Sequence, residues 1–323
     1  MNYRTFGKTS WSVSEVGYGM WGMASWTGSD DEQSLASLQL SVDEGCNFFD
    51  TAWAYGAGHS ETLLGRLIKD NPDKKIFIAT KVPPKNQGWP SLPEYTLEDC
   101  YPPDHIEEYV HKSLENLGVE KIDLIQLHTW DDSWFSDDRW LRKLNSLKEQ
   151  GIVDAIGLSL NRWEPWNGLR AVESGTIDSV QVIYNIFDQS PEDELLPACI
   201  ERNVAVIARV PFDEGSLTGT LTADSTWPEG DYRNKYFGPE NLSETLRRVE
   251  EIDADRPEEM TLAALALRFI LSNPAVSTVI PGMRNPKNVV QNIESASAGP
   301  LSDETIALMR KHKWIRKPKP WSA

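Results

Sequence analysis

One short stretch of the chain brings together side chains that could exchange a proton. The apolar pair at 48–49 is typical of the end of a buried strand, and Asp50, Tyr55 and a glycine-rich turn follow it directly. Ser60 is expected to cap the next helix, which places Asp50 and Tyr55 on a strand-to-helix loop. Taken alone, this stretch also fits a structural interpretation, since Asp often forms turns and loop Tyr often packs.

Other polar side chains stand where further predicted strands end. These residues are Lys81, His128, Ser159, Gln181 and Arg209. In a closed parallel barrel, catalytic side chains come from the carboxyl ends of different strands. We therefore expect these side chains to meet Asp50 and Tyr55 at one rim.

Four of these residues make chemical sense as one unit. A free phenol has a pKa of about 10, and a nearby ammonium group stabilises the phenolate and lowers that value. Lys81 would supply this charge to Tyr55, Asp50 would keep the lysine protonated, and His128 would orient a substrate carbonyl. The set is suited to protonating an oxygen while a reduced nicotinamide delivers hydride to the adjoining carbon.

The order of predicted elements indicates the fold class. Eight strand-helix pairs follow one another without a linker, which favours one α/β domain over residues 1–323, a (β/α)8 TIM barrel. Segments 3–6 and 11–14 are predicted to form a hairpin that plugs one end of the barrel. Long loops at 82–101 and 211–240 would lie at the C-terminal face, where long loops are usually functional.

An open, doubly wound sheet is the alternative fold. Gly17, Gly19 and Gly22 match the dinucleotide fingerprint, and Asp50 ends the next strand as a ribose-binding acid would. The match is weak, because a helix should open at the third glycine and the irregular residues 23–28 intervene.

Composition limits the partners. No run approaches the roughly 20 apolar residues of a membrane helix, and residues 1–7 lack the apolar core of a secretion signal. We therefore expect a soluble, cytoplasmic protein with no membrane partner. The formal net charge of −17 argues against nucleic acid, whose binding needs Lys and Arg to displace counterions. The sequence does not indicate an oligomeric state.

Cysteine and histidine usage bears on redox and metal chemistry. Three widely spaced cysteines form no Cys-x-x-Cys pair, which favours reduced, structural thiols. His128 precedes Asp131 and Asp132, an arrangement that suggests a metal-dependent hydrolase. The other nearby histidines, His105 and His111, lie on a predicted helix, so we expect no metal.

The motifs, taken in order, resemble those of the aldo-keto reductases over nearly the whole chain. They are Asp50-Thr51-Ala52-x-x-Tyr55-Gly56, Thr80-Lys81, Leu127-His128-Thr129-Trp130, Gly157-Leu158-Ser159, the strand 180–185 with Gln181, the run 215–219, and Ile280-Pro281-Gly282. The resemblance implies a catalytic tetrad of Asp50, Tyr55, Lys81 and His128 with Tyr55 as the acid, and a small-molecule aldehyde, ketone or alcohol as substrate. A nicotinamide-binding sensor or regulatory subunit with slow turnover remains the alternative from a different class.

The same resemblance implies where the cofactor would bind. Ser159 and Gln181, with Asn161 nearby, would hold the nicotinamide carboxamide, and Arg209 stands where the family often stacks a tyrosine on the ring. The loop residues expected over the pyrophosphate are Pro211, Ser216, Leu217 and Gly219. The residues expected around the adenosine half are Gly282, Arg284, Gln291 and Asn292. A cation at Arg284 would meet a 2′-phosphate, which favours NADP(H) over NAD(H).

Aromatic residues are unusually abundant, with 13 tryptophans. Trp21 and Trp130 fall beside strand ends, and Trp89 lies in the long loop 82–101. These three are predicted to line the substrate site, and an aromatic-walled mouth suits a sugar or an aromatic carbonyl.

Overall fold

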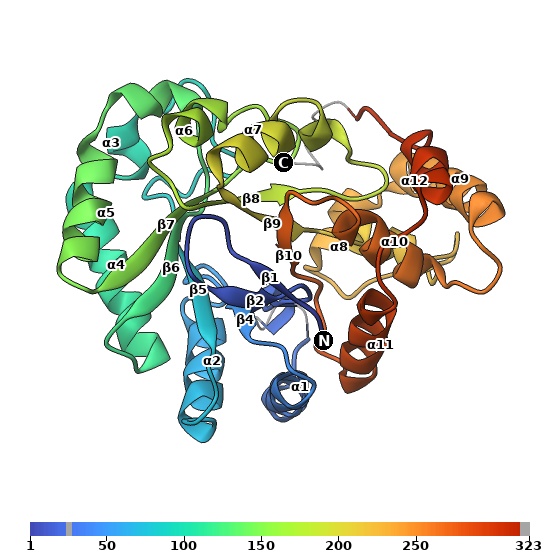
Figure 1. Ribbon diagram of the computed structural model, residues 1–323, viewed down its shortest axis with the longest axis horizontal. Helices are drawn as coiled ribbons and strands as arrows, with labels where there is room; N and C mark the ends of the chain where they lie inside the picture. The colour runs from blue at the N-terminus through green and yellow to red at the C-terminus, as the bar shows by residue number, and fades with distance from the viewer. Residues whose placement is uncertain (24–27, 317–323) are drawn as a thin grey trace.

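Eight parallel strands form the centre of the molecule (Figure 1), in a computed structural model that describes residues 1–23 and 28–316. The strands are β3 (Tyr18–Gly19), β4 (Phe48–Asp50), β5 (Phe77–Val82), β6 (Ile122–Leu127), β7 (Val153–Ser159), β8 (Ser179–Ile183), β9 (Ala205–Arg209) and β10 (Val276–Val279). They pair in chain order from β3 to β10. Parallel bridges from Val16 to Val279 and from Gly19 to Gly282 join the two edges. The predicted (β/α)8 barrel is therefore confirmed, and the open-sheet alternative is wrong.

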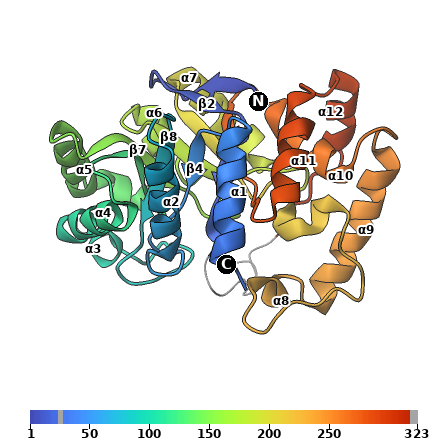
Figure 2. The ribbon, with the colours of Figure 1, turned by 90° about the horizontal axis from the view of Figure 1, so that it is seen from below.

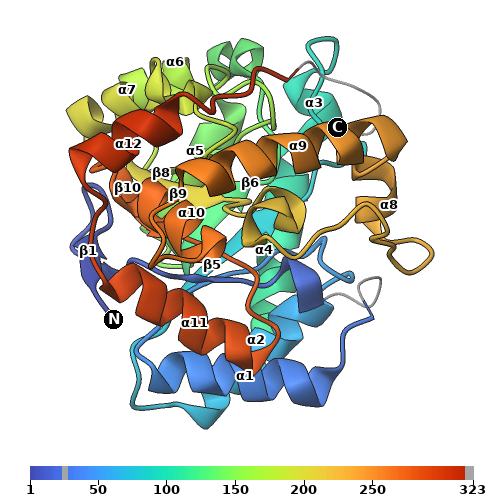
Figure 3. The same ribbon diagram turned by 90° about the vertical axis from the view of Figure 1, so that its right-hand side faces the viewer.

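Helices surround the barrel on its outer side (Figures 1 and 3). Those that follow the barrel strands are α1 (Asp31–Asp43), α2 (His59–Asp70), α4 (Pro103–Leu117), α5 (Arg139–Glu149), α6 (Leu169–Ser174), α7 (Leu195–Arg202), α10 (Leu262–Leu271) and α11 (Pro286–Ser297). Additional helices and helical turns are η1 (Trp21–Met23), α3 (Leu97–Cys100), η3 (Asp132–Ser136), η4 (Ser190–Glu192), η5 (Asp213–Thr218), α8 (Tyr232–Tyr236), α9 (Pro239–Asp255) and α12 (Asp303–Arg310). In Figure 3, α12 packs beside α9. No helix in the described ranges is long and apolar enough to cross a membrane.

The amino-terminal hairpin closes one end of the barrel, as the sequence predicts. Strands β1 (Tyr3–Thr5) and β2 (Ser12–Ser14) pair antiparallel, and Phe6 from their turn stacks on Phe48 with ring centroids 5.4 Å apart. Figure 2 shows the hairpin and α8 at opposite ends of the molecule. The open end, where α8 lies, is therefore the end at which the strands finish.

The barrel interior changes from apolar to polar along its axis. Near the hairpin, Ala79 and Leu124 belong to a buried apolar cluster that includes Phe6. Side chains alternate along a strand, so the next residues facing the same way are Lys81 and Gln126. These two are register partners on β5 and β6, and both are fully buried. The sequence thus places polar groups, among them the Lys81 amine, on rigid strands just above an apolar layer.

One predicted helix start differs from the structure. Helix α2 is capped by Gly58, in a left-handed conformation with φ of 93°, and not by Ser60. The Ser60 hydroxyl instead accepts a hydrogen bond from Thr51 at 2.8 Å, which ties the helix to the loop that carries Tyr55. In the candidate dinucleotide motif, the short η1 follows β3, and residues 24–27 lie outside the described ranges. All three cysteines are free and buried.

Candidate active site

A buried ion pair forms the base of the site. Lys81 Nζ lies 2.6 Å from Asp50 Oδ1 and donates a second hydrogen bond to the Thr51 carbonyl at 2.7 Å. The other carboxylate oxygen of Asp50 accepts hydrogen bonds from Gln181 at 2.7 Å and from Gln126 at 3.3 Å. A buried pair keeps both charges only when its remaining valences are satisfied, as they are here. Asp50 and the Thr51 carbonyl therefore fix the position of the Lys81 amine beneath the cavity.

Tyr55 lies directly above this pair. Its hydroxyl oxygen is 3.4 Å from Lys81 Nζ, and its loop is fixed because Gly58 N donates to the Trp53 carbonyl at 2.7 Å. Burial raises the pKa of the Tyr55 phenol above its ordinary value, and the Lys81 ammonium only partly opposes this effect. The sequence predicted a lowered pKa, because it revealed the charge of Lys81 but not the depth at which the phenol lies.

His128 packs beside Tyr55 and is the fourth member of this group. Its ring contacts Tyr55 and Trp89 edge to face, with ring centroids 5.6 Å and 4.5 Å away. Burial, together with the charges of Lys81 and Arg209, lowers the pKa of His128 well below its ordinary value. A neutral imidazole can donate one hydrogen bond to a carbonyl oxygen without competing with Tyr55 for the proton. The structure thus brings all four predicted catalytic residues together.

A cavity of about 1430 Å³ opens above these groups at the C-terminal ends of the strands. The predicted residues that line it are Trp21, Asp50, Tyr55, Trp89, His128, Ser159, Asn161, Gln181, Arg209, Pro211, Gly282, Arg284, Gln291 and Asn292. The predicted residues outside its lining are Lys81, Trp130, Ser216, Leu217 and Gly219. Lys81 acts from beneath, through Tyr55, so its absence from the wall fits its expected role.

Trp130 does not lie where the sequence suggested. It is fully buried, packs against Trp134 and Trp140, and donates its indole N–H to Asp132 at 2.8 Å. A substrate contact for Trp130 is therefore not supported. Strand β6 ends at Leu127, so the alternation of side chains does not continue to Trp130, which turns toward Trp140 of α5 while His128 lines the cavity.

Asn161 and the pyrophosphate loop also depart from the expected contacts. The Asn161 side-chain amide forms hydrogen bonds with the Ser91 backbone and with the Glu164 carboxylate. It therefore links two loops at the cavity wall. In the loop after β9, the Ser216 hydroxyl donates to Asp213 at 2.8 Å and Leu217 is fully buried. Neighbouring residues of this loop, including Gly215 and Thr218, face the cavity instead.

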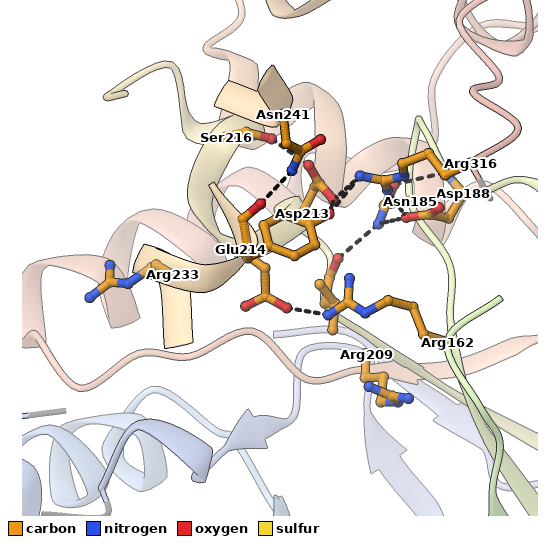
Figure 4. Close-up of polar contacts among 12 residues, drawn as sticks. Arg162, Asn185, Asp188, Arg209, Asp213, Glu214, Ser216, Arg233, Asn241 and Arg316 are labelled. Carbon is orange, nitrogen blue, oxygen red and sulfur yellow. Dashed lines mark hydrogen bonds and ion pairs between the residues drawn. The ribbon is translucent and has the colours of Figure 1, made fainter. Parts of the chain in front are cut away.

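Three functional residues were missed from the sequence. Gln126 supports Asp50, and strand alternation two residues before His128 could have revealed it. Arg162 and Glu214 form an ion pair between the loops after β7 and β9, and both line the cavity (Figure 4). Opposite charges in two loops of the same rim were the signal, but the sequence does not show that the loops meet.

Arg209 adds a positive charge to the same wall. It donates from Nη2 to the Leu160 carbonyl at 2.9 Å, and burial lowers the pKa of its guanidinium to about 10, which leaves it charged at neutral pH. The nearest carboxylates, Asp50 and Glu214, already have cationic partners. The guanidinium is therefore open to a ligand.

The cavity wall presents polar atoms that the described part of the protein leaves without a partner. They are His128 Nδ1, Arg162 Nη1, Trp163 Nε1, Arg209 Nε and Asn292 Nδ2. Buried polar atoms are nearly always hydrogen-bonded in native structures, so these positions indicate a bound ligand. The residues fit an elongated polar molecule such as a nicotinamide dinucleotide. Within residues 1–23 and 28–316, no group of three His, Cys, Asp or Glu side chains could hold a metal ion.

Comparison with known proteins identifies the class that this barrel and tetrad define. The model of the Aldo/keto reductase family matches residues 15–313, and the chain belongs to that family. It is therefore an oxidoreductase of a family that acts on carbonyls and alcohols with nicotinamide cofactors.

Particular relatives differ in cofactor and substrate. The NADH-specific methylglyoxal reductase of Escherichia coli is 30% identical, with 94% of this chain and 96% of the relative covered. An aldo-keto reductase of Schizosaccharomyces pombe whose name specifies NADP(+) is 31% identical, with 93% and 88% covered. Among solved structures, the glycerol dehydrogenase of Gluconobacter oxydans superposes with a TM-score of 0.79 at 27% identity, with 99% and 98% covered.

Proposed function

We propose that this protein interconverts an aldehyde or ketone and its alcohol, using NADP(H), with Tyr55 as the general acid in reduction. The observation that carries the proposal is the 3.4 Å approach of Lys81 Nζ to the Tyr55 hydroxyl, at the floor of a large cavity. When bound, the cofactor supplies the hydride. The protein must therefore hold the carbonyl and deliver one proton.

The roles of the side chains follow from their positions. His128 donates a hydrogen bond to the substrate oxygen and aims it at Tyr55. The phenol gives its proton to that oxygen as negative charge develops there, and Lys81 stabilises the phenolate that remains. Asp50, fixed by Gln181 and Gln126, holds the Lys81 side chain in place beneath Tyr55.

The preference for NADP(H) rests on the charge at one end of the cavity. Arg284 and Lys287 both line it, and Arg284 Nη1 is held by the Gly22 carbonyl at 2.9 Å. A guanidinium and an ammonium together suit the dianionic 2′-phosphate that distinguishes NADP(H) from NAD(H). The two relatives described above use different nicotinamides, so this preference belongs to our proposal.

The substrate class is proposed from the aromatic wall. Trp89 and Trp21 are both partly exposed and line the cavity near His128 and β3. Flat indole faces bind the apolar faces of sugars and aromatic rings. We therefore place sugar aldehydes and aromatic carbonyls first among the substrates to test.

Replacing the acid tests the proposal directly. Tyr55→Phe should lower kcat by about a hundredfold to ten-thousandfold and leave the Kd for NADPH unchanged, because only the proton donor is lost. Tyr3→Phe, on the hairpin at the other end of the barrel, is the matched control and should behave like wild type. An unchanged kcat in Tyr55→Phe would refute Tyr55 as the acid.

A substrate screen separates this proposal from a slow sensor. Wild-type protein is assayed with NADPH and NADH against sugar aldehydes, aromatic aldehydes and ketones, and cofactor absorbance is followed. Turnover of about 1 s⁻¹ or faster on any carbonyl is expected for an enzyme. Tight NADPH binding with turnover orders of magnitude slower on every compound would favour the sensor.

A further inference from the structure

A buried arginine from the carboxyl end of the chain lies behind the cavity wall. Arg316 follows α12, is 8% exposed, and its guanidinium sits between the carboxylates of Asp188 and Asp213 (Figure 4). Arg316 Nη1 is 2.8 Å from Asp213 Oδ1 and also donates to the Tyr236 hydroxyl at 2.6 Å. One side chain thus joins three segments: the loops after β8 and β9, and helix α8.

Aromatic rings keep this guanidinium in place. Its central carbon lies 4.7 Å from the ring centroids of both Trp163 and Trp314. The backbone N–H of Trp314 donates to the Phe187 carbonyl at 2.9 Å, next to Asp188. An arginine held by stacking and by two carboxylates is tightly constrained, since its planar fork loses little further freedom.

The β9 loop that Arg316 holds has an unusual backbone. Asp213, Glu214 and Gly215 have φ angles of 45°, 56° and 108°, so three successive residues are left-handed. Side chains other than glycine adopt this conformation at a cost, and they keep it only where surrounding contacts impose it. The contacts here converge on the Asp213 carboxylate, which also accepts from Tyr236 at 2.5 Å and from Ser216 at 2.8 Å.

The same backbone forms part of the cavity wall. Neither Arg316 nor Asp213 lines the cavity, but the next residues, Glu214 and Gly215, do. Glu214 reaches across to Arg162, and the loop N–H groups are those expected over the cofactor pyrophosphate. The conformation of the wall is therefore set by a charge cluster on its far side.

We propose that Arg316 is a positioning residue for the nicotinamide cofactor: through Asp213 it holds the 213–218 loop in the shape that binds the pyrophosphate. This inference rests on the proposed NADP(H)-dependent function. Removing the guanidinium leaves two buried carboxylates facing one another, which repel and release the left-handed turn. The cofactor then binds more weakly and leaves sooner, while the tetrad on β4, β5 and β6 is undisturbed.

The test compares Arg316→Met with Arg310→Met. Arg310 lies six residues earlier on α12, is exposed, pairs with Glu192 and does not line the cavity, so it serves as the control. For Arg316→Met we expect the Kd for NADPH, measured by fluorescence titration, to rise about tenfold or more. The rate of NADPH release in stopped flow should rise similarly, with kcat at saturating cofactor within about twofold of wild type. Arg310→Met should match wild type in every measurement.

Two further variants keep the test decisive if Arg316→Met folds poorly. Arg316→Lys keeps a positive charge but lacks the planar guanidinium. Its Kd for NADPH should lie between those of wild type and Arg316→Met. Asp213→Asn keeps a side chain that tolerates the left-handed turn, yet it removes the charge that Arg316 meets, so it should also weaken NADPH binding. The double variant of Asp213→Asn with Arg316→Lys should weaken NADPH binding by less than the two single changes added together, because both changes act on one contact.

The outcomes separate this inference from the proposed function. If wild type binds NADPH and the folded Arg316 and Asp213 variants bind it within about twofold as tightly, Arg316 is a structural residue and the inference is wrong. A fall in kcat with unchanged Kd would also overturn it. If wild type binds neither NADPH nor NADH, the proposed function fails first, and the inference fails with it.

Discussion

The two halves of the cavity rim are built in different ways. Around β4, β5 and β6, the reactive groups sit on strands or on one short turn, and they bond mainly to each other. Lys81 and Asp50 come from neighbouring strands, and Tyr55 lies only five residues beyond Asp50. Around β7, β8 and β9, the loops that extend the wall beyond the strand ends are held by charges from distant parts of the chain. Arg162 meets Glu214, and Arg316 meets Asp188 and Asp213.

This difference suggests a division of labour. A strand fixes a side chain to within a fraction of an ångström, which proton transfer requires. A loop fixed by a few ionic contacts can open at a smaller energetic cost, which allows a large cofactor to enter and leave. We therefore expect changes in the strand half to affect kcat and changes in the loop half to affect cofactor affinity.

Lys81→Met should produce the largest effect. The ammonium that stabilises the Tyr55 phenolate is lost, and Asp50 keeps a buried charge that only amide groups contact. We expect kcat to fall by at least about a hundredfold, with NADPH still bound. Lys75→Met is the matched control, since Lys75 precedes the other end of β5 and is largely exposed. A Lys81→Met variant with weakened cofactor binding and normal kcat would break the comparison.

The pH dependence of the two reaction directions should also be large. Reduction needs the protonated phenol, and burial raises the pKa of Tyr55 above its ordinary value of about 10. Reduction should therefore be flat from about pH 6 to about pH 9, and His128 should add no acid limb because its pKa lies well below about 6.5. Oxidation needs the phenolate, so its kcat should rise about tenfold per pH unit over this range. Saturating assays in both directions measure this, and a reduction rate that falls between pH 7 and pH 8 would contradict it.

Arg284→Ala probes the loop that follows β10, beside the loop half, where we propose that the adenosine end of the cofactor binds. If Arg284 meets the 2′-phosphate, as we propose, its loss should raise the Kd for NADPH about tenfold and leave the Kd for NADH nearly unchanged. Arg202→Ala, an exposed arginine on α7 outside the cavity lining, is the control. Fluorescence titration with both nicotinamides gives the ratio of the two Kd values. Equal weakening of NADPH and NADH binding would show that Arg284 does not contact the 2′-phosphate. The value of kcat should not change.

What the sequence could predict follows the same division. The strand half was accessible because alternation and order place Asp50, Lys81 and His128 at successive strand ends of a barrel. The hairpin plug was predictable because two short strand-forming segments, 3–6 and 11–14, flank a Gly7-Lys8-Thr9 turn. Even in this half, the predicted direction of the Tyr55 pKa shift was wrong, since burial depth is a tertiary property that no local pattern reveals.

The loop half was predicted less well, for a physical reason. Arg316 and Asp213 are separated by about a hundred residues, and their pairing depends on how long loops cross the rim. Nothing in the local sequence distinguishes Arg316 from a solvated arginine near a terminus. The prediction that Trp130 lines the substrate site was not supported, for a related reason. A tryptophan beside a strand end can face either the cavity or the helices, and this one packs on Trp140.

The smallest expected effect tests a loop that belongs structurally to the strand half. Trp89 follows β5, and its loop is fixed by Ser91, which donates to the Trp130 carbonyl at 2.6 Å. Because its ring packs edge to face on His128, Trp89→Ala should raise the KM for an aromatic aldehyde about fivefold, with kcat within about twofold. Trp21→Ala should raise that KM about twofold, since Trp21 lines the cavity next to β3 and not on the β5 loop. The exposed Trp166→Ala, outside the cavity lining, should have no effect. If Trp89→Ala lowered kcat as strongly as a change to His128, the ring would be orienting the imidazole for proton transfer. If no aromatic or sugar substrate responded to either Trp89→Ala or Trp21→Ala, the aromatic wall would not bind substrate.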